Sequence, residues 1–277
     1  MSQEVFIQEL FDRSYQSRPG FPDKDLAAGF ADQLFAFLFT PYRDRHSGKE
    51  SLQEEFDNLK NTFSALLYDL VHNKWEVKGL TDVFFDAIPS IYHRLLKDAA
   101  TIVQFDPAAE SIEEVLVAYP GFYATAIHRI AHQLYRQKIA TLPRILSEHA
   151  HSKTGVDIHP AAQIGTSFFI DHGTGIVIGE STIIGDNVKI YQGVTIGALN
   201  VSKEYAKLKR HPTIGDDVVI YSGATILGGE TVIGHHSIIG GNVWLTSSVE
   251  PYSVVYHKSE VIIRDKNPLP EPLNFII

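Results

Sequence analysis

The sequence predicts an α + β chain, in which an all-helical first half precedes a prism-shaped coil of short parallel strands. Two observations carry this prediction. In the first half, apolar side chains recur three or four residues apart, as at Phe56, Leu59 and Phe63, which is the spacing of one helix face. From Gly155 onward the isoleucines instead recur every six residues, which is typical of coils built from hexapeptide repeats.

We divide the chain into a helical domain over 1–150, a parallel coil over 151–265 and a tail over 266–277. The helical spacing predicts six to eight helices. One of them spans about 80–103, where Pro89 is expected to kink or interrupt it because proline lacks the backbone N–H that a helix interior needs.

The six-residue grid predicts three flat faces, because each hexapeptide supplies one short strand and one corner. The aliphatic side chain of each strand should point into the prism and stack on its counterparts in the neighbouring coils. Glycine follows many of these positions and allows a tight corner. The grid residues are Ile158, Ile164, Ile170, Ile176, Ile178, Ile184, Ile190, Ile196, Ile214, Ile220, Ile226, Val232, Ile233, Ile239 and Leu245. Ordinary sandwich strands would alternate with period two.

One polar and basic segment, 199–212, interrupts the grid. Ile196 and Ile214 are 18 residues apart, so we expect the segment to take the place of about one coil and to project from the prism. Irregular segments of this length in compact domains are usually functional.

Composition excludes several classes of function. The formal net charge of −9 argues against a nucleic-acid or anionic-membrane partner. The chain has no cysteine, which excludes disulfides, thiolate metal sites and cysteine nucleophiles. The N-terminal residues lack the basic start and apolar core of a signal peptide, so we expect a cytoplasmic protein.

Several local motifs resemble those of serine acetyltransferases. In the coil they are Val-Asp-Ile-His-Pro-Ala-Ala (156–162), Asp-His-Gly-Thr-Gly-Ile-Val-Ile-Gly-Glu (171–180), Arg-His-Pro (210–212) and Ile-Leu-Gly (226–228). In the helical half they are Phe-Asp-Pro (105–107), Gly-Phe (121–122) and Arg-Ile-Ala-His (129–132). The resemblance spans about residues 90–250.

This resemblance implies a left-handed coil and transfer of an acetyl group from acetyl-CoA to the hydroxyl of L-serine, a step of cysteine biosynthesis. It also implies a homotrimer or a dimer of trimers. The helical domain would serve oligomerisation and contribute part of the serine site.

The serine hydroxyl is a poor nucleophile, so the reaction needs a base of pKa near 7, and histidine is the natural choice. Two histidine–carboxylate pairs are candidates. Asp157 lies 15 residues before His172, a little less than one coil, and Glu180 and His211 bracket the projecting segment. The resemblance implies that His172, paired with Asp157, is the general base and that His211, oriented by Glu180, assists. We keep the choice of principal base open between the two histidines.

By the same resemblance, Asp106 and Asp171 hold the serine ammonium group and Arg210 holds the carboxylate, a role that suits a guanidinium fork. Each residue also has a simpler interpretation. Asp106 precedes a proline and is a candidate helix cap or turn residue. Arg210 belongs to a segment rich in solvated cations.

Acetyl-CoA, held mainly by backbone groups along the prism, is expected to contact a set of small residues and one lysine: Gly197, Ala198, Ser222, Gly223, Ala224 and Lys258. The chain departs from the family pattern here, because residues 255–260 stand where many members carry a cofactor-binding arginine. The terminal Ile277 resembles the isoleucine-ended tails that dock into cysteine synthase.

Three other functions remain as alternatives: transfer to another small hydroxyl or amine acceptor, a carbonic anhydrase with the same prism, and a non-catalytic scaffold. The carbonic anhydrase needs three histidines on zinc, and no convincing trio is spaced for it. His128 and His132 lie one helical turn apart but lack an evident third ligand, so we expect no metal.

Overall fold

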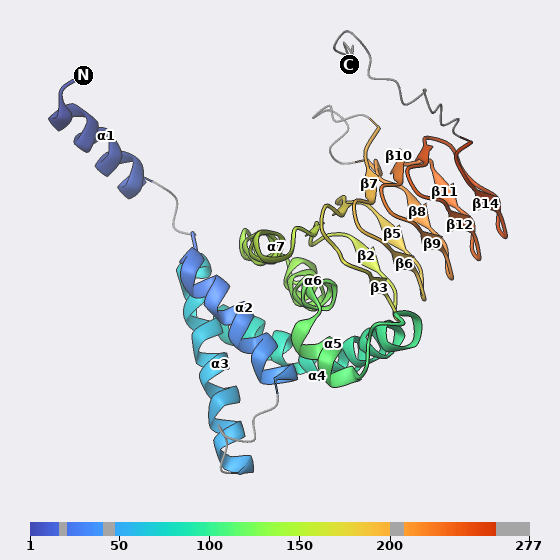
Figure 1. Cartoon of the computed structure of the whole chain (residues 1–277). Coiled ribbons are helices and arrows are strands. Elements are labelled where there is room, and N and C mark those ends of the chain that lie inside the picture. The colour runs from blue at the N-terminus through green and yellow to red at the C-terminus, as the bar shows by residue number, and fades with distance from the viewer. Residues whose placement is uncertain (17–20, 41–47, 200–207, 259–277) are drawn as a thin grey trace, which may run out of the picture.

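The computed structural model describes residues 1–16, 21–40, 48–199 and 208–258. The helices in these ranges are α1 (Gln3–Gln16), α2 (Lys24–Phe39), α3 (Lys49–Val71), α4 (Lys74–Phe105), α5 (Ile112–Ala118), α6 (Pro120–Arg136) and α7 (Leu142–Thr154). Their number agrees with the helical periodicity. All strands come later in the chain, and Figure 1 shows them stacked beside α4, α6 and α7.

Each strand spans only two or three residues. They are β1 (Asp157–Ile158), β2 (Gln163–Ile164), β3 (Phe169–Ile170), β4 (Val177–Ile178), β5 (Ile183–Ile184), β6 (Lys189–Ile190), β7 (Thr195–Gly197), β8 (Thr213–Ile214), β9 (Val219–Ile220), β10 (Thr225–Leu227), β11 (Val232–Ile233), β12 (Ile238–Ile239), β13 (Trp244–Leu245) and β14 (Val254–Val255).

The strands form three parallel sheets, which are the three faces of a left-handed prism (Figure 1). The first sheet has the order β1-β4-β7-β10-β13, the second β11-β8-β5-β2 and the third β14-β12-β9-β6-β3. We call them faces A, B and C. The predicted prism is therefore confirmed.

The isoleucine grid forms the layers of the prism core. Ile158 pairs with Ile178, which pairs with Ile196 and then Ile226 along face A. All four side chains are at most 3% exposed. The first residue of most strands points outward and the second inward, so a change of register by one residue would turn the isoleucines toward solvent.

The 199–212 segment interrupts a coil and does not replace one. Ile196 belongs to face A and Ile214 to the next face, B. The chain therefore uses 18 residues between two faces where the first coil uses six, from Ile158 to Ile164. Residues 200–207 lie outside the described residues.

Helix α4 runs through Pro89 over its 32 residues, so of the two expected effects, a kink or an interruption, the interruption does not occur. Asn73 caps its start by accepting hydrogen bonds from the N–H groups of Trp75 and Glu76, and Asp106 is its C-cap. The helix therefore ends directly at a predicted substrate residue.

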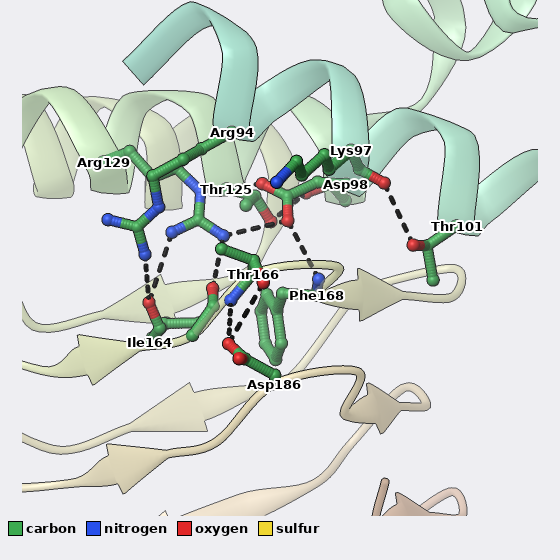
Figure 2. Close-up of polar contacts among 12 residues, drawn as sticks. Arg94, Lys97, Asp98, Thr101, Thr125, Arg129, Ile164, Thr166, Phe168 and Asp186 are labelled. Atoms are coloured by element: carbon green, nitrogen blue, oxygen red, sulfur yellow. Dashed lines mark hydrogen bonds and ion pairs between the residues drawn. The ribbon is translucent and has the colours of Figure 1, made fainter. Parts of the chain in front are cut away.

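A buried ion pair fastens the helices to the prism. Arg129 of α6 donates from Nε to Asp98 Oδ2 at 2.7 Å and from Nη2 to Asp98 Oδ1 at 2.9 Å. The same guanidinium reaches the carbonyl oxygens of Ile164 at 3.2 Å and Gly165 at 2.7 Å (Figure 2). Asp98 also accepts from the N–H of Phe168 at 2.9 Å.

Glycine permits a second close contact between helix and prism. A Cβ at Gly121, in the first turn of α6, would lie 2.5 Å from the carbonyl oxygen of Ile170. This contact places α6 against the corner that follows β3. No helix in the described part of the chain is long and apolar enough to cross a membrane.

Candidate active site

His172 lies at the corner between β3 and β4, where the backbone makes a left-handed turn. Three residues of this turn have positive φ: His172 at 57°, Gly173 at 88° and Gly175 at 76°. The two glycines adopt such values without strain. The imidazole is 69% exposed, and its Nε2 lies 3.8 Å from Asp171 Oδ2. The corner therefore presents a histidine with a carboxylate beside it.

Asp157, the expected partner of His172, begins β1 on the same edge of the prism. A hydrogen bond of 2.8 Å from Gly175 N to Gly155 O ties the two segments together. Within the described residues, however, no hydrogen bond or ion pair joins Asp157 to His172. The ring instead lies beside Asp171, the preceding residue, across the left-handed turn.

Two carboxylates and a phenol gather next to His172. Asp106 accepts a 2.7 Å hydrogen bond from the Tyr119 hydroxyl at Oδ2 and a 2.8 Å bond from Ala108 N at Oδ1. Burial raises the pKa of Asp171, and the charge of Asp106 raises it further, against the opposing effect of His172. Two close anions favour a cation between them.

Desolvation, the hydrogen bond to Asp106 and the charge of that carboxylate raise the pKa of Tyr119 to about 12. The phenol is therefore a hydrogen-bond donor at neutral pH. Sequence reasoning missed this residue, because a tyrosine before Pro-Gly also fits a simple helix boundary.

His211 lies at a different corner, directly before β8, and is only 6% exposed. Its Nδ1 accepts from Ser181 N at 3.1 Å and lies 2.9 Å from Ser181 Oγ. The Ser181 hydroxyl also accepts from the N–H groups of Arg210 at 2.9 Å and His211 at 3.1 Å. Burial, followed by the charge of Arg210, lowers the pKa of His211 to about 4.

Glu180 does not make the expected hydrogen bond to His211. It forms an ion pair with Arg210, whose Nη2 lies 2.5 Å from Glu180 Oε2, while Ser181 occupies His211 Nδ1. The charge of Glu180 still acts on His211 by raising its pKa, against the larger effect of burial. In the structure Ser181, and not Glu180, makes the hydrogen bond to His211 Nδ1.

Gly179 makes room for the His211 ring. A Cβ at this position would overlap the imidazole. Gly179 belongs to the repeat of glycines after isoleucines, so its position in the sequence predicted only a structural role.

The two histidines lie on opposite edges of face A. His172 is at the corner between faces C and A, and His211 is at the corner between faces A and B. Within one chain, the His172 group, with Asp106 and Asp171, therefore lies apart from the His211 group, with Glu180 and Arg210.

The expected cofactor residues divide in the same way. Gly197 and Ala198 lie at the end of β7, at the corner between faces A and B, whereas Ser222 and Gly223 lie at the corner between faces C and A. A Cβ at Gly197 would lie 2.9 Å from Leu227 Cδ2, so this edge of the coil is tightly packed.

The other two expected cofactor residues also differ from each other. Ala224 is fully buried, donates to Tyr221 O at 3.3 Å and accepts from Thr195 N at 2.9 Å, so it serves the coil's own packing and hydrogen bonding. Lys258 is exposed and follows β14, on the same edge as Gly223.

Several motif residues hold the fold together. His159 accepts from Ala161 N at 3.1 Å through Nδ1 and so fixes its own corner. His132 Nδ1 lies 2.8 Å from Pro160 O, and its ring is 5.7 Å from that of His128. Among the described residues, no three histidine, aspartate or glutamate side chains are grouped so that they could hold a metal ion.

Known proteins with similar sequences are serine acetyltransferases. A plasmid-encoded serine acetyltransferase of Synechococcus elongatus is 52% identical over 193 residues, which cover 68% of this chain and 59% of that protein. The serine acetyltransferase of Bacillus pumilus is 45% identical over 194 residues, which cover 66% of this chain and 88% of the relative. No protein-family model matches the chain.

The fold agrees with these relatives. Serine acetyltransferase isoform 3 from Entamoeba histolytica, solved in complex with cysteine, superposes with a TM-score of 0.75 at 33% identity. The superposition covers 92% of this chain and 93% of that one. The left-handed coil, the placement of the histidines and these relatives lead to one conclusion: the chain belongs to the serine acetyltransferase family.

Proposed function

We propose that the protein transfers an acetyl group from acetyl-CoA to the hydroxyl of L-serine and releases O-acetyl-L-serine and CoA. The observation that carries this proposal is the pair of carboxylates, Asp106 and Asp171, beside the exposed imidazole of His172. Two anions next to a base suit an acceptor that carries a cationic amine close to its hydroxyl, as serine does.

The ammonium group of serine would lie between Asp106 and Asp171. Its positive charge relieves the repulsion between the carboxylates, which otherwise favours protonation of Asp171. Tyr119 holds Asp106 in place through its hydroxyl. Asp157, on the same edge, supports the imidazolium of His172 by its charge once the proton has moved.

In this proposal His172 is the base and His211 is a donor. Ser181 N–H can only donate, so it requires the unprotonated form of His211 Nδ1 and leaves the proton of the neutral ring on Nε2. A histidine of pKa about 4 is a weak base at neutral pH. Its Nε2–H is suited to stabilising the oxygen that becomes negative in the tetrahedral state.

The proton and electron balance follows from these roles. His172 takes the hydroxyl proton as the serine oxygen bonds to the thioester carbonyl carbon. The carbon–sulfur bond then breaks, and the imidazolium of His172 returns the proton to the CoA sulfur. Arg210, paired with Glu180, binds the serine carboxylate.

Because face A separates the two histidine groups, we also propose that a complete site forms between neighbouring chains. The His172 corner of one chain would meet the His211 corner of the next in a homotrimer, or in a dimer of trimers. Gly197 and Ala198 of one chain would then face Ser222, Gly223 and Lys258 of its neighbour along one acetyl-CoA groove.

A mixing experiment tests this assembly. His172→Ala and His211→Ala chains are each expected to be inactive. Refolded together, they should recover part of the wild-type activity, because some interfaces join two intact corners. Absence of any recovery, with the oligomer intact by light scattering, contradicts the shared site.

The acetyl transfer itself is tested by incubating the wild type with acetyl-CoA and a panel of serine, homoserine, a sugar amine and an aminoglycoside. Free thiol and product mass are then measured. We expect O-acetylserine from serine alone. Transfer to another acceptor but not to serine contradicts the proposal.

The C-terminal Ile277 lies outside the described residues. Our proposal that it docks into cysteine synthase rests on the resemblance of the tail alone. Deletion of Ile277 should abolish co-elution with a cysteine synthase and leave acetyl transfer unchanged.

A further inference from the structure

A cavity of about 660 Å³ lies between the helices and the prism. Side chains of α4 and α6 form one wall, and β2 and β5 of face B form the other. None of the residues assigned to acetyl transfer lines it. The cavity is therefore distinct from the candidate active site.

The helical wall is rich in cationic and basic side chains. Arg94 comes from α4, while His128, Arg129, His132 and Arg136 come from α6. The three α6 positions 128, 132 and 136 are spaced by four, so they share one helix face. No aspartate or glutamate lines the cavity.

Arg129 is already neutralised, because it is paired with Asp98 and bonded to two prism carbonyls. Arg94 is not. Its Nη2 donates to Ile164 O at 2.9 Å (Figure 2), but its buried Nε has no hydrogen-bond partner. Arg136, exposed at the rim, makes no ion pair with any described side chain. Two guanidinium groups therefore remain without a bonded carboxylate.

His128 provides an independent observation. It is 3% exposed, and its Nδ1 has no hydrogen-bond partner, which is costly for a buried polar atom. Burial lowers its pKa well below the ordinary value, and the charged groups that act on it are His132, Arg129, Arg94 and His159, all basic. An anion in the cavity, or a water molecule bound to that anion, would give His128 Nδ1 a hydrogen-bond partner.

The remaining lining is mixed: Gln133 and Gln163 are polar, whereas Ile91 on the helical wall and Ile183 and Ile184 on the prism wall are apolar. We propose that this cavity binds a phosphate-bearing small molecule, with the phosphate held by Arg94 and Arg136 and an apolar body against the isoleucines. Guanidinium suits phosphate because its N–H groups match two oxygens at once. The volume exceeds what a bare phosphate ion needs.

Calorimetric titration of the full-length wild type provides the test, with inorganic phosphate and phenyl phosphate as separate probes at constant ionic strength. Both probes should bind saturably at one site per chain, with phenyl phosphate tighter because its ring contacts the apolar wall. Arg94→Gln and Arg136→Gln should each weaken binding roughly tenfold, the size expected for a hydrogen bond to a charged group.

Lys138→Gln is the matched control. It removes the same charge two residues beyond Arg136 and lies outside the cavity lining, so binding should not change. Equal affinity for both probes would assign the site to free inorganic phosphate and overturn the organic ligand. Absence of saturable binding, or an equal loss in Lys138→Gln and Arg136→Gln, would overturn the site itself.

Binding is read without any activity assay, so the outcome does not depend on the proposed acetyl transfer. If Arg94→Gln disturbs folding through the lost bond to Ile164, Arg136→Gln, at the exposed rim, still decides the question.

Discussion

The Tyr119 hydroxyl donates a 2.7 Å hydrogen bond to Oδ2 of Asp106. The tyrosine caps the start of α6 and the aspartate caps the end of α4, so this bond joins two helix ends at the proposed serine site. The bond fixes the orientation of a carboxylate that the resemblance assigned to the serine ammonium group.

Tyr119→Phe should therefore weaken serine binding. We expect the KM for serine to rise roughly tenfold, in line with the loss of one hydrogen bond to a charged group, with little change in the KM for acetyl-CoA. Steady-state kinetics with each substrate varied in turn provide the measurement. Tyr135→Phe, at an exposed tyrosine remote from Asp106, is the control. An equal rise in both KM values would contradict a specific role at the serine site.

Gly179→Ala should abolish acetyl transfer while leaving the coil assembled. The added methyl would overlap the ring of His211 and displace it from Ser181, so we expect kcat to fall by at least about a hundredfold. Far-ultraviolet circular dichroism checks that the fold is retained.

Gly79→Ala is the matched control for this substitution. Its Cβ meets nothing within 4 Å on α4, so activity should stay at the wild-type level. The free energy of unfolding should rise by about 0.5–1 kcal/mol, because alanine is the better helix former. Full activity in Gly179→Ala would show that the His211 position is not needed for catalysis.

Much of the fold was predictable because the isoleucine period is a direct consequence of the geometry. Ile158, Ile178, Ile196 and Ile226 had to point inward, and the structure stacks them. The 199–212 segment was misjudged because the 18 residues between Ile196 and Ile214 match the length of a whole coil. Spacing alone does not distinguish a coil from an insertion at one corner.

Sequence motifs named the candidate site residues, whose roles stay predictions, but they did not predict the contacts of these residues. Motifs indicated Glu180 and His211, yet the partner of His211 Nδ1 is Ser181. Serine is common at turns, so its type gives no signal of this role. The separation of His172 from His211 by face A also depends on which corner each occupies, which becomes clear only when the strands are assigned to faces.

Asp98→Ala should strongly destabilise the protein. The substitution leaves the Arg129 guanidinium buried without its carboxylate partner and removes the acceptor for Phe168 N–H. Breaking a buried pair in this way costs about 3–5 kcal/mol of the free energy of unfolding. Urea denaturation provides the measurement.

The exposed ion pair between Lys78 and Asp82 serves as the control for this prediction. Asp82→Ala should leave the urea midpoint unchanged within error, because solvent screens exposed pairs. Similar midpoints for the Asp98→Ala and Asp82→Ala variants would show that the Arg129 pair does not hold the helices on the prism.

The depressed pKa of His211 predicts a loss of stability in mild acid. Above the ordinary pKa of 6.5, the imidazole is neutral in both the folded and the unfolded chain. Between 6.5 and about 4 the unfolded chain binds a proton that the folded protein excludes, so the free energy of unfolding falls as the pH falls. His211→Gln should reduce this dependence, because glutamine does not titrate. Urea midpoints of the two proteins at pH 7.5, 6, 5 and 4.5 provide the measurement, and parallel curves would show that His211 protonates as readily in the folded protein as in the unfolded chain.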